Sequence, residues 1–103
     1  MNIVKKAGCI LINMKEKKIA LVLRKGEYSF PKGHLEEMET IRDCARRETI
    51  EETGHEVEII GEEISIIRYK SSGGEYVENH FFVGIDTGLT DKKIAKNCKE
   101  ETE

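Results

Sequence analysis

Residues 33–55, GHLEEMETIRDCARRETIEETGH, decide the fold, because they contain the clearest helix of the chain. Small or apolar side chains recur there at the spacing of one helical face, at Ile41, Cys44, Ala45 and Thr49. Thr40 is a suitable N-cap with Asp43 three residues later, and Gly54 stands where a left-handed C-cap is usual. The pattern predicts a helix over Ile41–Thr53.

Three glutamates of this helix share one patch of its surface, since Glu48, Glu51 and Glu52 stand at i, i+3 and i+4. Glu48 and Glu52 also continue the apolar stripe, where a carboxylate is costly unless something compensates its charge. A hard divalent cation does so, because Mg²⁺ prefers carboxylate oxygens, waters and substrate phosphates. The alternative is a solvated helix laced with ion pairs, because Asp43–Arg47 and Arg47–Glu51 have i, i+4 spacing.

Strand patterns flank the helix on both sides. Before it, residues 6–13 and 19–23 read as a hairpin of two buried strands. Residues 26–34 hold the single proline and two glycines, so we expect a loop there. After the helix, residues 57–69 and 75–86 supply further strand material. Strands on both sides of one helix predict an α/β domain with a mixed sheet.

The fixed positions of the segment resemble the Nudix box, Gly-x5-Glu-x7-Arg-Glu-U-x-Glu-Glu-x-Gly-U, in which U is usually aliphatic. The matching residues are Gly33, Glu39, Arg47, Glu48, Glu51, Glu52 and Gly54. The U positions depart from the pattern and hold Thr49 and His55, of which we read His55 as structural. By this resemblance the chain is identified as a Nudix hydrolase, with the box at residues 33–55 of a single domain over 1–103.

The resemblance implies a Nudix-type α/β/α sandwich with a mixed β-sheet. It also implies that relatives continue into another strand and a C-terminal helix, so we expect this chain to be C-terminally short. A missing element would leave an apolar face or an edge of the sheet uncovered. The chain is then either a fragment or completes itself as a homodimer.

The resemblance further implies that Glu48, Glu51 and Glu52 bind Mg²⁺, with Mn²⁺ as a substitute, and that one of them or another acidic residue activates the attacking water. Arg47 would hold these glutamates through ion pairs, so the four residues are the expected catalytic set. Phosphoanhydride cleavage suits this arrangement. The protein need only position a water in line, while metal ions neutralise the developing charge.

Further roles follow from the same resemblance. Gly33 would let the loop approach closely, and Glu39 would either assist near the metals or be structural. Many relatives place another catalytic or metal-binding glutamate in the loop that the acidic ending resembles. Glu100 and Glu101 are the candidates, and a solvated tail is the alternative.

The residues before the box indicate a substrate class. Residues 28–36 resemble the Trp-x-Phe-Pro-Lys-Gly-His entry of Nudix enzymes that act on dinucleoside polyphosphates, with Tyr28 in place of tryptophan. Diadenosine tetraphosphate hydrolases are the closest analogy, although diphosphoinositol polyphosphate and messenger-RNA decapping relatives share the Phe-Pro-Lys-Gly stretch. We expect Lys32, Gly33, Arg24 and Tyr28 to contact substrate. The alternative for the two cations is a solvated surface charge.

The composition limits the classes of binding partner and the cellular compartment that we expect. The 103 residues allow one domain, and the net charge of −3 argues against a cationic track for long nucleic acid. An odd number of cysteines, three, argues against a disulfide framework and indicates a reducing cytoplasm. No stretch approaches the length of a membrane span. We therefore expect a soluble, cytoplasmic protein with a small nucleotide substrate and no membrane partner.

The leading hypothesis is a Mg²⁺-dependent hydrolase of dinucleoside polyphosphates such as diadenosine tetraphosphate. Two alternatives within the enzyme class are a nucleoside triphosphate pyrophosphatase and an RNA 5′-pyrophosphohydrolase. From another class, the domain is a catalytically silent nucleotide or metal sensor. All box glutamates are retained, so silence would come from elements absent from this chain.

Overall fold

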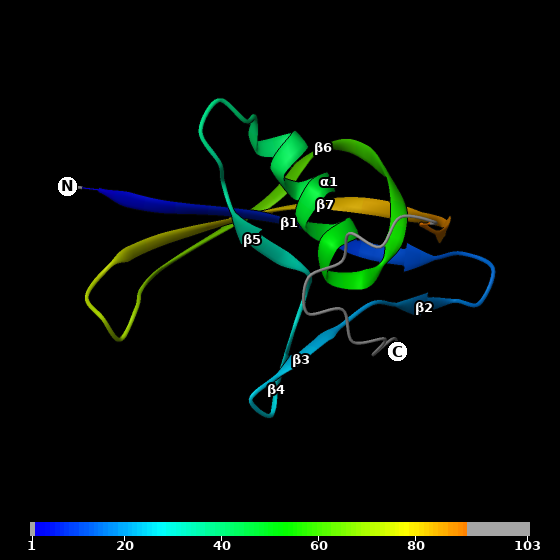
Figure 1. The fold of residues 1–103 in the computed structure, drawn as a ribbon, viewed down its shortest axis with the longest axis horizontal. Coiled ribbons are helices and arrows are strands. Elements are labelled where there is room, and N and C mark those ends of the chain that lie inside the picture. The colour runs from blue at the N-terminus through cyan, green and yellow to red at the C-terminus, as the bar shows by residue number, and fades with distance from the viewer. Residues whose placement is uncertain (1, 91–103) are drawn as a thin grey trace.

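Strand β1 (Ile3–Asn13) lies inside a mixed sheet in the computed structural model, which describes residues 2–90 (Figure 1). It pairs in parallel with β7 (Tyr76–Leu89) and antiparallel with β2 (Lys18–Ile19) and β5 (Lys32–His34). Strand β6 (His55–Lys70) pairs antiparallel with β7 at the edge of the sheet. The expected α/β fold with a mixed sheet is confirmed.

The single helix of residues 2–90, α1 (Ile41–Thr53), begins and ends where the sequence predicted. The backbone N–H of Asp43 donates to the Thr40 hydroxyl at 3.0 Å, an N-cap that stabilises a helix by about 1 kcal/mol. Gly54 closes the other end at φ 74°, and its N–H donates to the Ile50 carbonyl at 2.8 Å. Local capping chemistry therefore fixes both ends. This helix is neither long nor apolar enough to cross a membrane.

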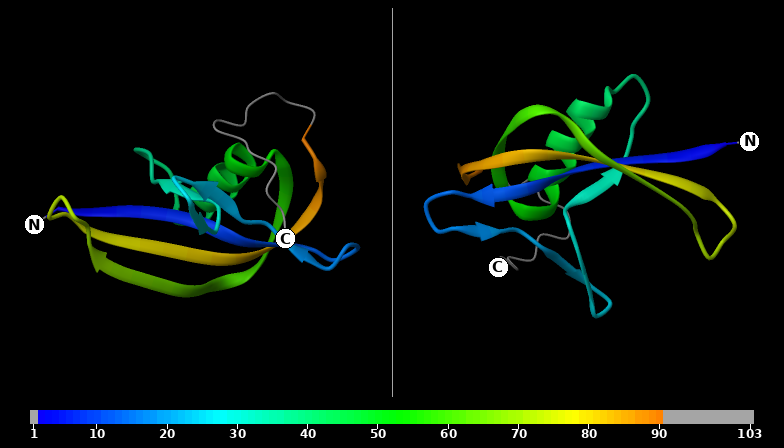
Figure 2. Two further views of the ribbon diagram at one scale, coloured as in Figure 1. Left: turned by 90° about the horizontal axis from the view of Figure 1, so that it is seen from below. Right: turned by 180° about the vertical axis from the view of Figure 1, so that it is seen from behind.

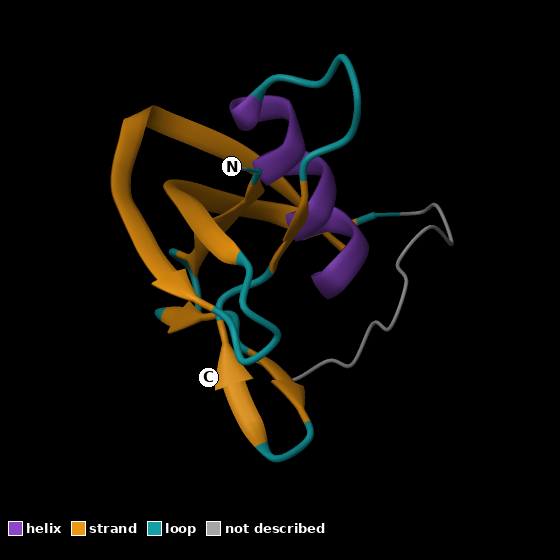
Figure 3. Ribbon diagram, turned by 90° about the vertical axis from the view of Figure 1, so that its left-hand side faces the viewer, coloured by secondary structure: helices purple, strands orange, loops and turns teal. Residues whose placement is uncertain are grey.

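The helix packs on one face of the sheet (Figures 2 and 3). The side chains of the core are mostly small where the two layers meet, and include Ala7, Cys9, Leu11, Cys44, Ala45 and Phe82. Alternate residues of β1 supply the first three, as a pleated strand requires. Gly84 of β7 has no room for a side chain, because a Cβ there would lie 2.3 Å from the Val57 side chain. Small residues thus bring the helix close to the sheet.

The expected hairpin of residues 6–13 and 19–23 is partly wrong. Within residues 19–23, only Ile19 and Ala20 bond to β1, through β2 and the adjoining Ala20 N–H. Strand β3 (Val22–Arg24) instead pairs with β4 (Glu27–Ser29) in a separate two-stranded sheet (Figure 1). Lys25 and Gly26 form its turn at φ 51° and 80°, and two positive values are typical of a type I′ hairpin. The loop expected over 26–34 therefore contains strands β4 and β5.

The strands predicted after the helix are confirmed, and both are longer than expected. Strand β6 shifts its register against β7 between Ile60 and Ser65, which marks a bulge or irregularity in a single long strand. On the face away from α1, Ile60, Ile67 and Tyr69 are exposed. Across the described part of the chain one helical layer covers the sheet, so the second layer of the expected sandwich is not seen there.

Candidate active site

Arg47 of α1 is the centre of an ion-pair network. Its Nε and Nη2 donate to the two carboxylate oxygens of Glu39 at 2.7 and 3.0 Å. Its Nη1 donates to Glu48 Oε2 at 3.0 Å and to Glu51 Oε1 at 3.3 Å. Nη2 also donates to the backbone carbonyl of His34 at 3.0 Å. One guanidinium therefore joins the loop before the helix to two glutamates on the helix.

The charges of this network reinforce one another. The hydrogen bonds that Arg47 donates to Glu39 are the main reason that the pKa of Arg47 lies above its ordinary value. In return, the Arg47 guanidinium holds the pKa of Glu39 below its ordinary value. The backbone N–H of Glu36 also donates to the Glu39 carboxylate, at 3.1 Å. Glu39 therefore fixes the guanidinium of Arg47 from the loop before the helix.

Gly33 of β5 packs directly against Glu48. A Cβ on Gly33 would lie 2.0–2.4 Å from the Glu48 carboxylate atoms, far inside van der Waals contact. Glu48 is 2% exposed, so its carboxylate has little room to move away. Gly33 is paired with Ala7 of β1, and this register places both residues toward the helix. The close approach requires glycine for its lack of a side chain.

Glu52, in the last turn of α1, is the second buried glutamate. Its side chain is 4% exposed and forms an ion pair with the guanidinium of Arg24, whose side chain is 50% exposed. Arg24 is the last residue of β3, so the pair links the separate two-stranded sheet to the helix. A buried carboxylate needs compensation of this kind.

Lys32 lies within electrostatic range of Glu52 and of two other cations. Burial is the main reason that the pKa of Lys32 is lowered, and the nearby charges of Lys6 and Arg24 lower it further. The negative charge of Glu52 acts in the opposite direction. Lys6 was missed at the sequence level. The pairing of β1 with β5 brings it near Lys32, and no sequence signal indicated that pairing.

The other predicted site residues lie in different surroundings. Glu51 is partly buried beside Arg47, at the rim of the network. Tyr28 is 55% exposed on β4, where it pairs with Leu23 across the small sheet. Glu100 and Glu101 lie outside the described residues.

The glutamates offer suitable donors for a hard cation. Glu48, Glu51 and Glu52 present carboxylate oxygens within little more than one helical turn, which suits Mg²⁺. Within residues 2–90, no three acidic, histidine or cysteine side chains form a ready metal-binding cluster. Arg47 and Arg24 hold the carboxylates instead. The donor chemistry therefore fits a divalent metal, and arginines carry the charge compensation in this structure.

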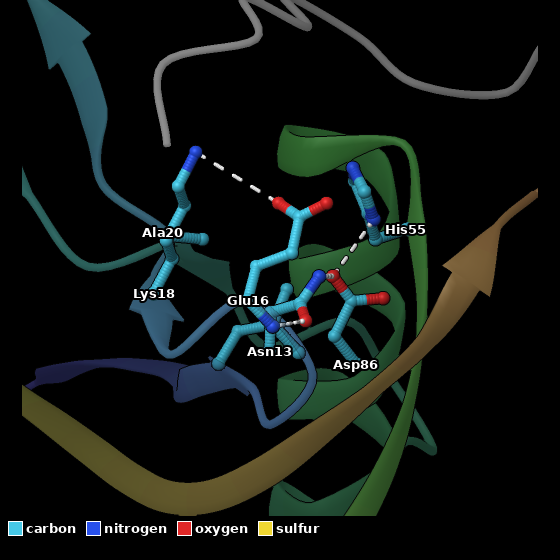
Figure 4. Close-up of a pocket in the computed structure, with 7 residues that line it drawn as sticks. Asn13, Glu16, Lys18, Ala20, His55 and Asp86 are labelled. Atoms are coloured by element: carbon cyan, nitrogen blue, oxygen red, sulfur yellow. Dashed lines mark hydrogen bonds and ion pairs between the residues drawn. The ribbon is translucent and has the colours of Figure 1, made fainter. Parts of the chain in front are cut away.

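A polar cavity of about 90 Å³ lies elsewhere in the fold (Figure 4). His55 Nδ1 lies 2.9 Å from Asp86 Oδ2, and Asp86 also accepts hydrogen bonds from Asn13 Nδ2 at 3.5 Å and Gly88 N–H at 2.8 Å. The lining residues include no box glutamate; they are Leu11, Asn13, Glu16, Lys18, Ala20, His55 and Asp86. The cluster fastens the chain after α1 to β7.

Comparison with known proteins gives one family. The sequence profile described as the NUDIX domain matches residues 3–103. A NUDIX hydrolase from Nitrosomonas europaea has a similar structure, with a TM-score of 0.78 and 20% identity over 99% of this chain and 71% of its own. The MutT protein from Methanosarcina mazei Go1 gives 0.74 at 19%, over 98% and 75%. The Ap4A hydrolase of C. elegans gives 0.74 at 18%, over 99% and 79%. These likenesses establish a common fold.

Proposed function

The chain belongs to the Nudix family of hydrolases, which act on pyrophosphate bonds, and from this premise we propose that it is a Mg²⁺-dependent hydrolase of a nucleoside diphosphate derivative. Residues 1–103 form one such domain in this proposal. Glu48, Glu51 and Glu52 hold the metal, and Mn²⁺ is a substitute. The observation that carries the proposal is the burial of Glu48 and Glu52, whose charges two arginines compensate. A structural helix has no need of carboxylates there.

The residues of the chain divide the chemical work. Arg47 orients Glu48 and Glu51, and Glu39 fixes Arg47 from the loop. One of the glutamates, or an acidic residue outside the described part, takes a proton from the attacking water. The metal, when bound, neutralises charge that develops on the phosphate oxygens. Because the three proposed metal ligands lie on one helix, a rigid element would hold the metal in a fixed position relative to the water and the phosphate.

The proposed substrate is a dinucleoside polyphosphate such as diadenosine tetraphosphate. Support comes from the Phe-Pro-Lys-Gly stretch before the box and from the cationic group Arg24, Lys32 and Lys6, which fits a chain of several phosphates. Fold likeness to an Ap4A hydrolase agrees with this assignment. In the proposal the phosphates approach the backbone of β5 at Gly33, whose missing side chain makes room for Glu48, and the exposed ring of Tyr28 contacts a base.

A catalytically silent sensor is the second candidate. The observation that favours it is the engagement of all three helix glutamates by arginines in this structure. A sensor would bind metal or nucleotide without turnover. Activity measurements separate the two candidates.

The setting of the protein is also a proposal. The described cysteines, Cys9 and Cys44, are buried free thiols, which suits a reducing cytoplasm. The edge strand β6 exposes Ile60 and Ile67, and such an edge supports the proposed homodimer. The partner expected in every case is a small nucleotide, not a membrane or a long nucleic acid.

The test is Mg²⁺-dependent turnover of diadenosine tetraphosphate, beside nucleoside triphosphates, by the parent and its Glu52→Gln variant. Glu56→Gln is the matched control, because Glu56 lies just beyond the helix and pairs with Arg46 on the surface. Turnover that is lost in Glu52→Gln and kept in Glu56→Gln supports the proposal. Metal binding without turnover favours the sensor. Equal turnover by all three proteins contradicts the metal assignment.

A further inference from the structure

The two arginines that compensate the helix glutamates are held in very different ways. Arg47 is 23% exposed, and its guanidinium hydrogen-bonds to Glu39, Glu48 and Glu51 and to a backbone carbonyl. The side chain of Arg24 is 50% exposed, and its guanidinium donates a hydrogen bond to Glu52. A guanidinium with several partners is fixed in place, whereas a half-exposed one exchanges partners at low cost.

The position of Arg24 makes such an exchange simple. It ends β3, immediately before the type I′ turn at Lys25 and Gly26, in the two-stranded sheet that is separate from the main one. Movement of its long side chain therefore breaks no backbone pairing of the main sheet. Lys32 stays within electrostatic range of both Arg24 and Glu52.

In the proposed function, the divalent metal and Arg24 compete for the carboxylate of Glu52. A divalent metal needs its carboxylate oxygens, and Arg24 already holds one of them, Oε2. The ion pair must be broken before the metal takes full hold. A polyphosphate that arrives with the metal offers Arg24 a new anionic partner nearby.

We propose that Arg24 is an exchangeable counter-ion, which neutralises Glu52 until metal binds and then passes to a phosphate of the substrate. This inference rests on the proposed function. The consequence is that metal and polyphosphate favour each other's binding. Metal displaces Arg24 from Glu52 and so frees it for a phosphate, and a phosphate that binds Arg24 leaves Glu52 open to the metal. The alternative is that Arg24 is a static bridge, which links the two-stranded sheet to the helix permanently.

The two views predict different signs for Arg24→Gln. An exchangeable counter-ion competes with metal and assists phosphate. The variant should then bind Mn²⁺ about fivefold more tightly without nucleotide, as expected for loss of one partly exposed ion pair. It should also bind imidodiphosphate about fivefold more weakly at saturating Mg²⁺. A static bridge predicts no gain in metal affinity.

The experiment is titration calorimetry of the parent, Arg24→Gln, Arg24→Lys and Arg46→Gln. Arg46→Gln removes the same charge from an exposed pair with Glu56, so it controls for long-range electrostatics. Arg24→Lys keeps a cation at this position and should bind Mn²⁺ like the parent. This conservative variant keeps the test usable if Arg24→Gln fails to fold. Thermal unfolding gives a second readout, because the rise in Tm on adding Mg²⁺ should be larger for Arg24→Gln than for the parent.

Each outcome decides the matter. Tighter Mn²⁺ and weaker imidodiphosphate binding by Arg24→Gln, with Arg46→Gln near the parent, establish the exchange. Unchanged or weaker Mn²⁺ binding by Arg24→Gln overturns it and leaves the proposed hydrolase standing. The same gain in both glutamine variants also overturns it, since the effect is then general. Absence of Mn²⁺ binding by the parent overturns both the exchange and the metal site of the proposed function.

Discussion

Gly33 and Glu48 are in such close contact that no side chain fits between them. The nearest carboxylate atom of Glu48 would lie 2.0 Å from a Cβ built on Gly33. The two residues come from β5 and α1, so their contact sets the spacing between the strand and the helix that carries the candidate metal ligands. This spacing is a property that single substitutions can test.

Gly33→Ala should destabilise the protein and displace Glu48. Overpacking of a buried site typically costs about 1–3 kcal/mol, and here the crowded atoms belong to a buried carboxylate. Urea unfolding measures the change in stability, and calorimetry with Mn²⁺ measures the change in metal affinity. Gly73→Ala is the control, since a Cβ there meets its nearest atom at 3.9 Å. Equal behaviour of the two variants would show that the contact is unimportant.

Arg47→Lys should lower kcat, although the charge is conserved. Lysine cannot reproduce the two-pronged contact with Glu39 while also reaching Glu48 and Glu51. Loss of a partner that orients metal ligands typically costs about 10–100-fold. Steady-state kinetics at saturating Mg²⁺ check this, with Arg46→Lys as a control on the same helix. A parent-like kcat for Arg47→Lys would mean that the network does not position the glutamates.

The Glu39–Arg47 pair should make stability depend on pH. Arg47 keeps the pKa of Glu39 below its ordinary value of 4.5 in the folded protein. Ionised Glu39 therefore stabilises the fold above its unfolded-state pKa, and this contribution disappears as the pH falls through the lower folded-state value. Glu39→Gln should be less stable than the parent at pH 7, and the difference should shrink below pH 4.5. Urea unfolding across this range, beside the exposed-site control Glu75→Gln, measures it. A difference independent of pH would assign the effect to packing.

The buried thiols should resist alkylation. Cys9 and Cys44 are fully buried, and burial raises the pKa of the Cys44 thiol to about 12 and raises that of Cys9. In a Cys98→Ser variant, iodoacetamide at pH 8 should leave the native protein unmodified and modify both cysteines in urea. Mass spectrometry counts the modifications. Rapid labelling of the native protein would show that the layer between helix and sheet opens readily.

The helix and its network were predictable because their determinants are local. Thr40 and Gly54 cap the helix through contacts within a few residues, and i, i+4 spacing alone places Arg47 beside Glu51. The metal-binding and catalytic roles of the glutamates stay predictions. Glu48 and Glu52 are buried, as expected for two charged residues at positions of the sequence where the helical period calls for apolar side chains.

The path of the chain between β1 and the helix was not predictable in the same way. Residues 19–23 look like one strand, but pairing partners divide them, and a partner is a property of the whole fold. Lys25 adopts positive φ, which its residue type does not favour. Lys6 became a candidate site residue because β5 folds back on β1. Long-range pairing decides all three.

The parallel pairing of β1 with β7 also constrains the order in which the protein can form. On a ribosome, β1 emerges first, but the long neighbour that completes its hydrogen bonding emerges only after the helix and β6. Sheets built from such distant segments form slowly, because a large loop must close before the contacts stabilise it. A nascent chain that ends before β7 leaves one edge of β1 without its parallel partner. We therefore expect the sheet to complete its pairing only after the whole chain through β7 has been synthesised.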